Sequence, residues 1–342
     1  MLRAVQAGRT GYSSGRGEPK LLKALSDRYT ARSGRPIGTD QFACFPGTQT
    51  ALFTSMLTLA EAGDGVIVPD PLYASYEGVV RATGAEMQTV KLRPETGFHL
   101  RAEDLEAAIR PNSRVLLLNA PHNPTGAVLS AEEIAAIGAV CRKHDLWIIS
   151  DEVYEELIFD GVPFASPLDD PDLAERVVCV SSISKSHAAP GFRSGWAVGS
   201  PEFINRLLPV AETMLFGNQP FIADMTAEAI EAGSAVAGRM REAYKRRADQ
   251  LAAALREVNT LSCFMPEAGM FMLIDVRATG LDGEAFALRL LEERGVAVMP
   301  GASFGDEARG FIRVSLTVPD ERIAEAAARI AEFARAQEGQ PA

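Results

Sequence analysis

Short runs of apolar residues recur along the first two thirds of the chain, and longer segments with a helical period separate them. Each run holds three or four residues, mostly Val, Ile and Leu, which is typical of strands buried on both faces of a parallel sheet. The runs are residues 66–68, 115–118, 147–149, 177–180 and 196–198. This pattern predicts an α/β fold with a mostly parallel central sheet and helices on both faces.

Residues 130–144 show how one strand connects to the next. Ser130 and Glu133 have the spacing of a capping box, in which each side chain bonds to the backbone of the other residue. Ile134, Ile137 and Cys141 follow at helical spacing and form one apolar face. We expect a helix here that packs this face against the sheet.

The pattern changes after about residue 225. An Ala- and Arg-rich segment, 226–258, predicts one long helix, and strand-like runs at 270–274 and 311–316 precede a final helix. This order indicates a smaller α+β domain joined to the first through the long helix. The expected division is residues 1–33 as an N-terminal segment of the small domain and of a dimer contact, 34–230 as the large domain, and 231–342 as the small C-terminal domain.

Length and charge limit the class of protein. The 342 residues are 47% hydrophobic, enough for one large core and a smaller one. The net charge is -11, and no block of like charges forms a basic groove or tail. Nucleic acids and anionic membranes are therefore not expected partners. An anionic substrate would need a few placed cations acting against the overall field.

The cysteines and histidines do not form a recognisable ligand set. The four cysteines are scattered without a CxxC pair, and the histidines do not cluster at metal-ligand spacing, so we expect neither a disulfide nor a metal. The longest apolar stretches have the length of strands, and the first residues lack the pattern of a signal peptide. We expect a cytoplasmic protein.

One lysine stands directly after a buried-type strand. Lys185 lies in the block SSISKSH (181–187), which precedes PGFRSGW (190–196). A lysine in such a place is costly to desolvate unless it is used, and forming a Schiff base with an aldehyde cofactor is one such use. A loop lysine that reaches solvent would give the same pattern.

A carboxylate follows another predicted strand. Asp151 lies in the block SDEVY (150–154), which comes directly after the run 147–149. Ligands gather beyond the carboxyl ends of parallel strands, so Asp151 and Lys185 can face one crevice. A carboxylate there can keep a pyridinium nitrogen protonated. The alternative is that Asp151 only caps a helix.

Two Gly- and Pro-containing turns complete the pattern. The block NAPHNPTG (119–126) fixes a turn from which Asn123 can point its amide at a phenolate-like oxygen. The block PGTQTAL (46–52) opens a helix whose first backbone amides can bind a phosphate, with Gly47 allowing close approach. A plain turn and an ordinary capped helix remain open alternatives.

Taken together and in this order, the SxSKS, NPTG, SDEVY and GFRSGW blocks resemble those of the class I and II aminotransferases, the fold-type-I pyridoxal-phosphate (PLP) enzymes of the aspartate-aminotransferase superfamily. The resemblance runs from about residue 11 to 333. It implies ping-pong transfer of an amino group from an L-amino acid to a 2-oxo acid, with PLP bound to the large domain. Residues 184–188, 214–217 and 269–281 look most similar to arginine:pyruvate transaminases, which makes arginine and pyruvate the first candidates.

The resemblance also implies roles for residues around the cofactor ring. Lys185 would hold PLP as a Schiff base and move the proton of the substrate α-carbon. Asp151 would pair with the ring nitrogen, while Tyr154 and Asn123 would hydrogen-bond the ring hydroxyl oxygen. Tyr73 would stack on the ring, although it could instead be a core residue, as could Tyr76.

Further residues match the family's anion-binding positions. The phosphate would be held by Thr48, Gln49, Ser182 and Arg193. Tyr12 matches a tyrosine that reaches the phosphate of the neighbouring subunit, which implies a homodimer with shared active sites. Arg313 would clamp the substrate α-carboxylate with a bidentate contact, and Asn123 would also touch the substrate; an exposed strand arginine is the alternative reading of Arg313.

Some alternatives share these residues. Cysteine-conjugate β-lyases and aminocyclopropane-carboxylate synthases of the same superfamily carry nearly the same set. A PLP-binding transcriptional regulator is disfavoured by the acidic charge and by the lack of a basic segment before residue 11. Relatives usually begin with a further Gly-rich stretch that covers the substrate pocket, so we expect a truncated or misassigned start here.

Overall fold

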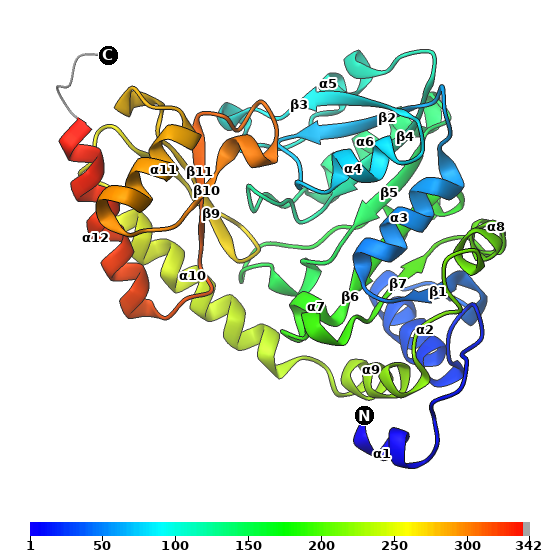
Figure 1. Cartoon of the computed structure of the whole chain (residues 1–342). Coiled ribbons are helices and arrows are strands. Elements are labelled where there is room, and N and C mark those ends of the chain that lie inside the picture. The colour runs from blue at the N-terminus through cyan, green and yellow to red at the C-terminus, as the bar shows by residue number, and fades with distance from the viewer. Residues whose placement is uncertain (338–342) are drawn as a thin grey trace.

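The computed structural model describes residues 1–337, and its larger sheet has seven strands in the order β1-β7-β6-β5-β4-β2-β3 (Figure 1). Strands β2 to β6 pair in parallel, whereas β7 is antiparallel to both β6 and β1. The strands are β1 Phe42–Phe45, β2 Gly65–Asp70, β3 Glu86–Lys91, β4 Ser113–Asn119, β5 Trp147–Asp151, β6 Val177–Ser182 and β7 Gly195–Val198. The predicted mostly parallel sheet is confirmed.

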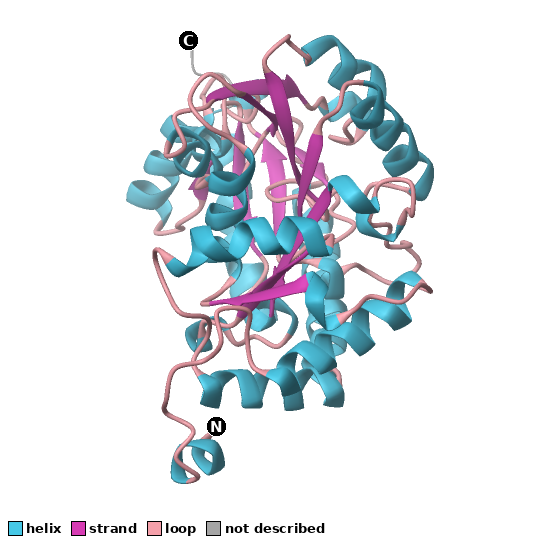
Figure 2. Ribbon diagram, turned by 90° about the vertical axis from the view of Figure 1, so that its right-hand side faces the viewer, coloured by secondary structure: helices cyan, strands magenta, loops and turns pink. Residues whose placement is uncertain are grey.

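Helices cover both faces of this sheet, as Figure 2 shows. Because side chains alternate along a strand, Leu116 and Ile148 enter one hydrophobic core while Leu117 and Ile149 enter the other. Burial on both faces explains why the strands appear as continuous apolar runs. The helices of this part are α2 Pro19–Ser33, α3 Thr48–Leu59, α4 Tyr76–Arg81, α5 Ala102–Ala108, α6 Ala131–Lys143, α7 Ile183–Ser186, α8 Pro201–Glu212 and α9 Pro220–Ala232.

The connecting helix α6 has the predicted capping box. The Ser130 hydroxyl accepts the backbone N–H of Glu133 at 3.2 Å, and the Glu133 carboxylate accepts the backbone N–H of Ser130 at 2.7 Å. Ile134, Ile137 and Cys141 are buried in the core beneath the sheet. The predicted helix and its apolar face are therefore confirmed.

A second sheet of four antiparallel strands, in the order β10-β11-β9-β8, has its own hydrophobic core. Its strands are β8 Ser262–Phe264, β9 Phe271–Asp275, β10 Met299–Pro300 and β11 Phe311–Ser315, and the helices around it are α10 Ala235–Leu255, α11 Gly283–Arg294 and α12 Asp320–Gln337.

The expected single helix over 226–258 is two helices. Helix α9 ends at Gly233, whose φ of 69° is one that glycine adopts without strain, and Ser234 caps α10 by accepting the N–H of Ala237 at 3.0 Å. The prediction of one uninterrupted helix was therefore wrong.

The N-terminal segment holds two helices, α1 and α2. Helix α1 (Leu2–Gln6) stands at the edge of the molecule, and α2 lies against α9 (Figure 1). Leu21, Leu25 and Tyr29 of α2 are fully buried in a core of the large sheet. This packing places residues 19–33 beside the large sheet, while the expected division of the chain stays a prediction.

Within residues 1–337 no helix combines the length and the apolar character needed to cross a bilayer. The same residues contain no group of three or more His, Cys, Asp or Glu side chains arranged to hold a metal ion.

Candidate active site

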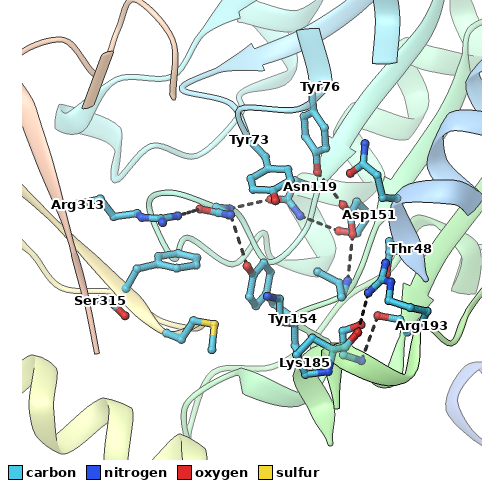
Figure 3. Close-up of a pocket in the computed structure, with 18 residues that line it drawn as sticks. Thr48, Tyr73, Tyr76, Asn119, Asp151, Tyr154, Lys185, Arg193, Arg313 and Ser315 are labelled. Carbon is cyan, nitrogen blue, oxygen red and sulfur yellow. Dashed lines mark hydrogen bonds between the residues drawn. The ribbon is translucent and has the colours of Figure 1, made fainter. Parts of the chain in front are cut away.

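A cavity of about 310 Å³ lies beyond the carboxyl ends of β4, β5 and β6, where the two sheets face each other. Asp151 and Ser182 end their strands, Thr48 begins α3, and Arg313 reaches in from β11 of the second sheet (Figure 3). The predicted site residues that line this cavity are Thr48, Gln49, Tyr73, Asn123, Asp151, Tyr154, Ser182, Lys185, Arg193 and Arg313. In particular, Lys185 and Asp151 share one cavity.

Lys185 is presented by the one-turn helix α7, which follows β6 directly. The Ser182 hydroxyl caps this turn by accepting the N–H of Ser184 at 3.3 Å. Burial, and next the charge of Arg313, lower the pKa of Lys185, against the opposing effect of Asp151. A lower pKa enlarges the fraction of neutral amine, which is the nucleophilic form.

Asp151 is buried at the end of β5 and held by two hydrogen bonds. Its Oδ2 accepts the Tyr76 hydroxyl at 2.9 Å, and its Oδ1 accepts the backbone N–H of Val153 at 3.3 Å. Burial raises the pKa of Asp151 to about 6, although both hydrogen bonds act in the opposite direction. The carboxylate is thus oriented but lacks a cationic hydrogen-bond partner among the described residues.

Tyr76 and Asn119 also line the cavity, and sequence reasoning gave neither a role. Tyr76 is therefore a direct partner of Asp151, in addition to being buried. Asn119 donates from Nδ2 to the backbone oxygen of Asp151 at 2.9 Å and accepts the N–H of Asn123 at 2.8 Å. It ties together the turns that follow β4 and β5.

A chain of hydrogen bonds joins the two sides of the cavity. Arg313 donates from Nη1 to Oδ1 of Asn123 at 2.8 Å, and Asn123 donates from Nδ2 to the Tyr154 hydroxyl at 3.4 Å (Figure 3). The amide of Asn123 thus fixes the position of both the guanidinium and the phenol. Burial raises the pKa of Tyr154, which therefore remains a neutral donor.

The guanidinium of Arg313 packs over two aromatic rings, 4.4 Å from the ring centre of Phe304 and 5.1 Å from that of Phe271. Burial lowers the pKa of Arg313. Its Nε is buried and has no hydrogen-bond partner among the described residues. A held guanidinium with a free donor suits an incoming carboxylate.

The opposite end of the cavity has the features of an anion cradle. The N-terminus of α3 opens here, and the Thr48 hydroxyl is buried without a partner among residues 1–337. Arg193 donates to the Pro190 oxygen at 2.8 Å and to the Pro46 oxygen at 3.4 Å. A Cβ at position 47 would lie 2.2 Å from Nη2 of Arg193 and would displace the guanidinium, and the φ of 92° at Gly47 also favours glycine. These groups fit a phosphate.

Tyr12 is the one predicted site residue that does not line the cavity. It is 92% exposed, and its ring packs edge-on against Phe216, with ring centres 5.8 Å apart. Within a single chain Tyr12 does not meet the other predicted residues.

Comparison with known proteins agrees with this geometry. The family model described as "Aminotransferase class I and II" matches residues 3–330. The chain belongs to this family. The arginine–pyruvate transaminase of Pseudomonas aeruginosa is 42% identical to this aminotransferase over 328 residues, which cover 96% of the chain and 83% of that protein. The aspartate/prephenate aminotransferase of Cereibacter sphaeroides is 35% identical and covers 97% of the chain and 85% of the relative.

Solved structures show the same fold as this aminotransferase. A mutant aspartate aminotransferase of Thermus thermophilus has a TM-score of 0.92 and 33% identity, covering 97% of the chain and 86% of that structure. The aromatic aminotransferase from Pyrococcus horikoshii has a TM-score of 0.95 and 28% identity, covering 98% and 91%. The resemblance first carried by four short blocks therefore extends over nearly the whole chain.

Proposed function

We propose that this aminotransferase uses PLP, held by Lys185, to transfer the amino group of an L-amino acid to a 2-oxo acid. The observation that carries the proposal is one cavity lined by a desolvated amine, a buried carboxylate and a held guanidinium, those of Lys185, Asp151 and Arg313. Each of these groups is costly to bury without a partner, and PLP with an amino acid supplies a partner for each.

PLP, when bound, supplies an aldehyde that condenses with amines and a ring that withdraws electrons from the substrate α-carbon. The residues around it would hold and orient it. Asp151 would face the ring nitrogen of PLP, and its carboxylate would keep that nitrogen protonated. Tyr154 and Asn123 would donate to the ring hydroxyl oxygen, and Tyr73 would cover one face of the ring.

The phosphate fits the cradle opposite Arg313. The amides at the start of α3, the Thr48 and Ser182 hydroxyls and the Arg193 guanidinium converge there with Gln49. The unpaired hydroxyl of Thr48 and the close approach of Gly47 to Arg193 support this placement.

Lys185 would bind the aldehyde carbon in the absence of substrate and act as a base once a substrate amine replaces it. Its lowered pKa favours a neutral amine that accepts the proton from the α-carbon and returns it on the other side of the reaction. Arg313 would hold the α-carboxylate through N–H groups of its guanidinium, with Asn123 keeping the guanidinium in place.

L-Arginine and pyruvate are the proposed donor and acceptor, because the 42% identical relative is named an arginine–pyruvate transaminase. Rapid mixing of the PLP-loaded protein with L-arginine, L-aspartate or L-phenylalanine separates the candidates. We expect arginine to bleach the cofactor absorbance fastest and pyruvate to restore it with formation of alanine. The absence of a spectral change with arginine would remove this donor, and release of pyruvate and ammonia from a cysteine conjugate without any oxo acid would indicate a lyase.

We also propose a homodimer in which Tyr12 reaches the phosphate site of the partner subunit. Support comes from exposed apolar side chains of the N-terminal segment, namely Leu2, Val5 and Tyr12, and from the exposed Phe216 that packs against Tyr12. A cytoplasmic location stays a prediction.

A further inference from the structure

Glu152 follows Asp151 directly, yet it is fully buried and does not line the cavity. It has no contact with the space where substrate would lie, so the proposed chemistry gives it no part. Its carboxylate accepts hydrogen bonds from the side chains of Ser150 at 3.0 Å, Cys179 at 2.9 Å, Arg32 at 2.8 Å and Ser166. Burial raises the pKa of Glu152, and the charge of Arg32 opposes this effect.

Arg32 supplies the compensating charge from the last turn of α2. Its Nη1 donates to Oε2 of Glu152 and to Oε2 of Glu155, both at 2.8 Å, and its Nη2 reaches Asp169 at 3.1 Å. The guanidinium also stacks on Tyr29, 4.5 Å from the ring centre. Arg32 therefore binds the first and the last residue of the segment 152–155.

Two groups that line the cavity, those of Asp151 and Tyr154, lie next to or within this short segment. Asp151 precedes it, Tyr154 lies inside it, and the backbone N–H of Glu152 bonds to the oxygen of Val180 in the next strand. Without Arg32, Glu152 would be left buried without a cationic partner, whereas Glu155 would keep Arg28, so the segment would lose its ionic contact at the Glu152 end. The charge of Glu152 also acts on Asp151 and raises its pKa.

We propose that Arg32 and Glu152 form a positioning pair that fixes Asp151 and Tyr154 relative to the cofactor ring. The inference rests on the function proposed above for Asp151 and Tyr154. The pair lies outside the cavity and acts on Asp151 and Tyr154 only through the segment 152–155. The other titratable groups around Asp151 are Tyr76 from α4 and Lys185 from α7.

Arg28 provides a matched control on the same helix. It lies one turn before Arg32 and binds Glu155 at 2.7 Å and Glu156 at 2.8 Å, but it does not contact Glu152. When Arg28 is replaced, Glu155 still has its ion pair with Arg32. Replacing Arg28 or Arg32 by Met removes an ion pair with Glu155 in both cases, but only the change at Arg32 removes the contact with Glu152.

The test compares Arg32→Met, Arg28→Met, Glu152→Gln and the double variant Arg32→Met/Glu152→Gln as PLP-loaded proteins. We expect Arg32→Met to lower kcat by up to about 100-fold with little change in KM, because a small misplacement of catalytic groups has this effect. The pH midpoint of the cofactor absorbance should shift as well. Arg28→Met should have the kcat and the absorbance midpoint of the wild-type protein.

The double variant tests whether the two residues act as a unit. We expect it to lose no more activity than Arg32→Met alone, since the buried charge that Arg32 compensates at position 152 is then absent as well. Additive losses, or an Arg32→Met protein that matches Arg28→Met in kcat and in absorbance midpoint, would overturn the inference. A wild-type protein without cofactor absorbance or transamination would instead overturn the proposed function itself.

Arg32→Lys carries the test if Arg32→Met does not yield folded protein. Lysine keeps the charge but lacks the planar fork that reaches Glu152 and Glu155 together. We expect a folded protein, by circular dichroism, with reduced kcat and a shifted absorbance midpoint. Wild-type values for both in this variant would equally overturn the inference.

Discussion

Replacing Asp151 by Asn in the cofactor-free protein tests the electrostatics of the site without any assumption about the substrate. Burial raises the pKa of Asp151 to about 6 from its ordinary value of 3.8. Asparagine fits the same space, since its Oδ1 can accept the N–H of Val153 while its Nδ2 donates to the Tyr76 hydroxyl. The substitution therefore removes the charge and retains both contacts.

The sign of the effect follows from proton binding. Between pH 4 and pH 6 the folded wild-type protein keeps a proton on Asp151 that the unfolded chain has released, so its stability falls as pH rises. A shift of roughly two pKa units corresponds to about 2 to 3 kcal/mol between pH 4 and pH 7. The free energy of unfolding of Asp151→Asn, minus that of the wild-type protein, should grow by this amount over the same range.

Urea unfolding of the two cofactor-free proteins, followed by circular dichroism at several pH values, measures this difference. Asp70→Asn is the control: Asp70 is also buried with a pKa raised to about 6, but it does not line the cavity and instead accepts the N–H groups of Asp306 and Glu307. Adding PLP should abolish the pH-dependent difference for Asp151→Asn and leave that for Asp70→Asn. A difference for Asp151→Asn that does not vary with pH would refute the reasoning.

Three further substitutions separate the parts of the site. Lys185→Ala should lose the visible absorbance of bound PLP, measured on the purified protein, while PLP still binds weakly through its phosphate; a retained absorbance would contradict the role of this lysine. Arg313→Leu should raise KM for amino-acid donors and leave the cofactor spectrum intact, and an equal loss of cofactor would argue against a carboxylate clamp. Arg193→Gln should weaken PLP binding by about 10- to 100-fold in equilibrium dialysis, the effect of losing one charged hydrogen bond; an unchanged Kd would place the phosphate elsewhere.

The central strands could be predicted because each is buried on both faces. Continuous apolar runs located β2, β4, β5, β6 and β7. Strand β3 escaped notice since it lies at the edge of the sheet and alternates exposed and buried residues, from Glu86 to Lys91. The break between α9 and α10 was missed because Gly233 and Ser234 interrupt a segment whose composition otherwise favours one helix.

The site residues that the sequence revealed are those in compact blocks, each placed after a strand or at the start of a helix. Tyr76 and Asn119 were beyond its reach, because both bind Asp151, which lies 75 and 32 residues away along the chain and meets them only in the folded topology. The link between Arg32 and Glu152 spans 120 residues and depends on how α2 packs beneath the large sheet.

The most direct test of the account is to reduce the PLP-loaded wild-type protein with borohydride and to locate the modified residue by peptide mass spectrometry. We expect a single phosphopyridoxyl group, on Lys185. Modification of a different lysine, or none at all in a protein that has retained PLP, would contradict it.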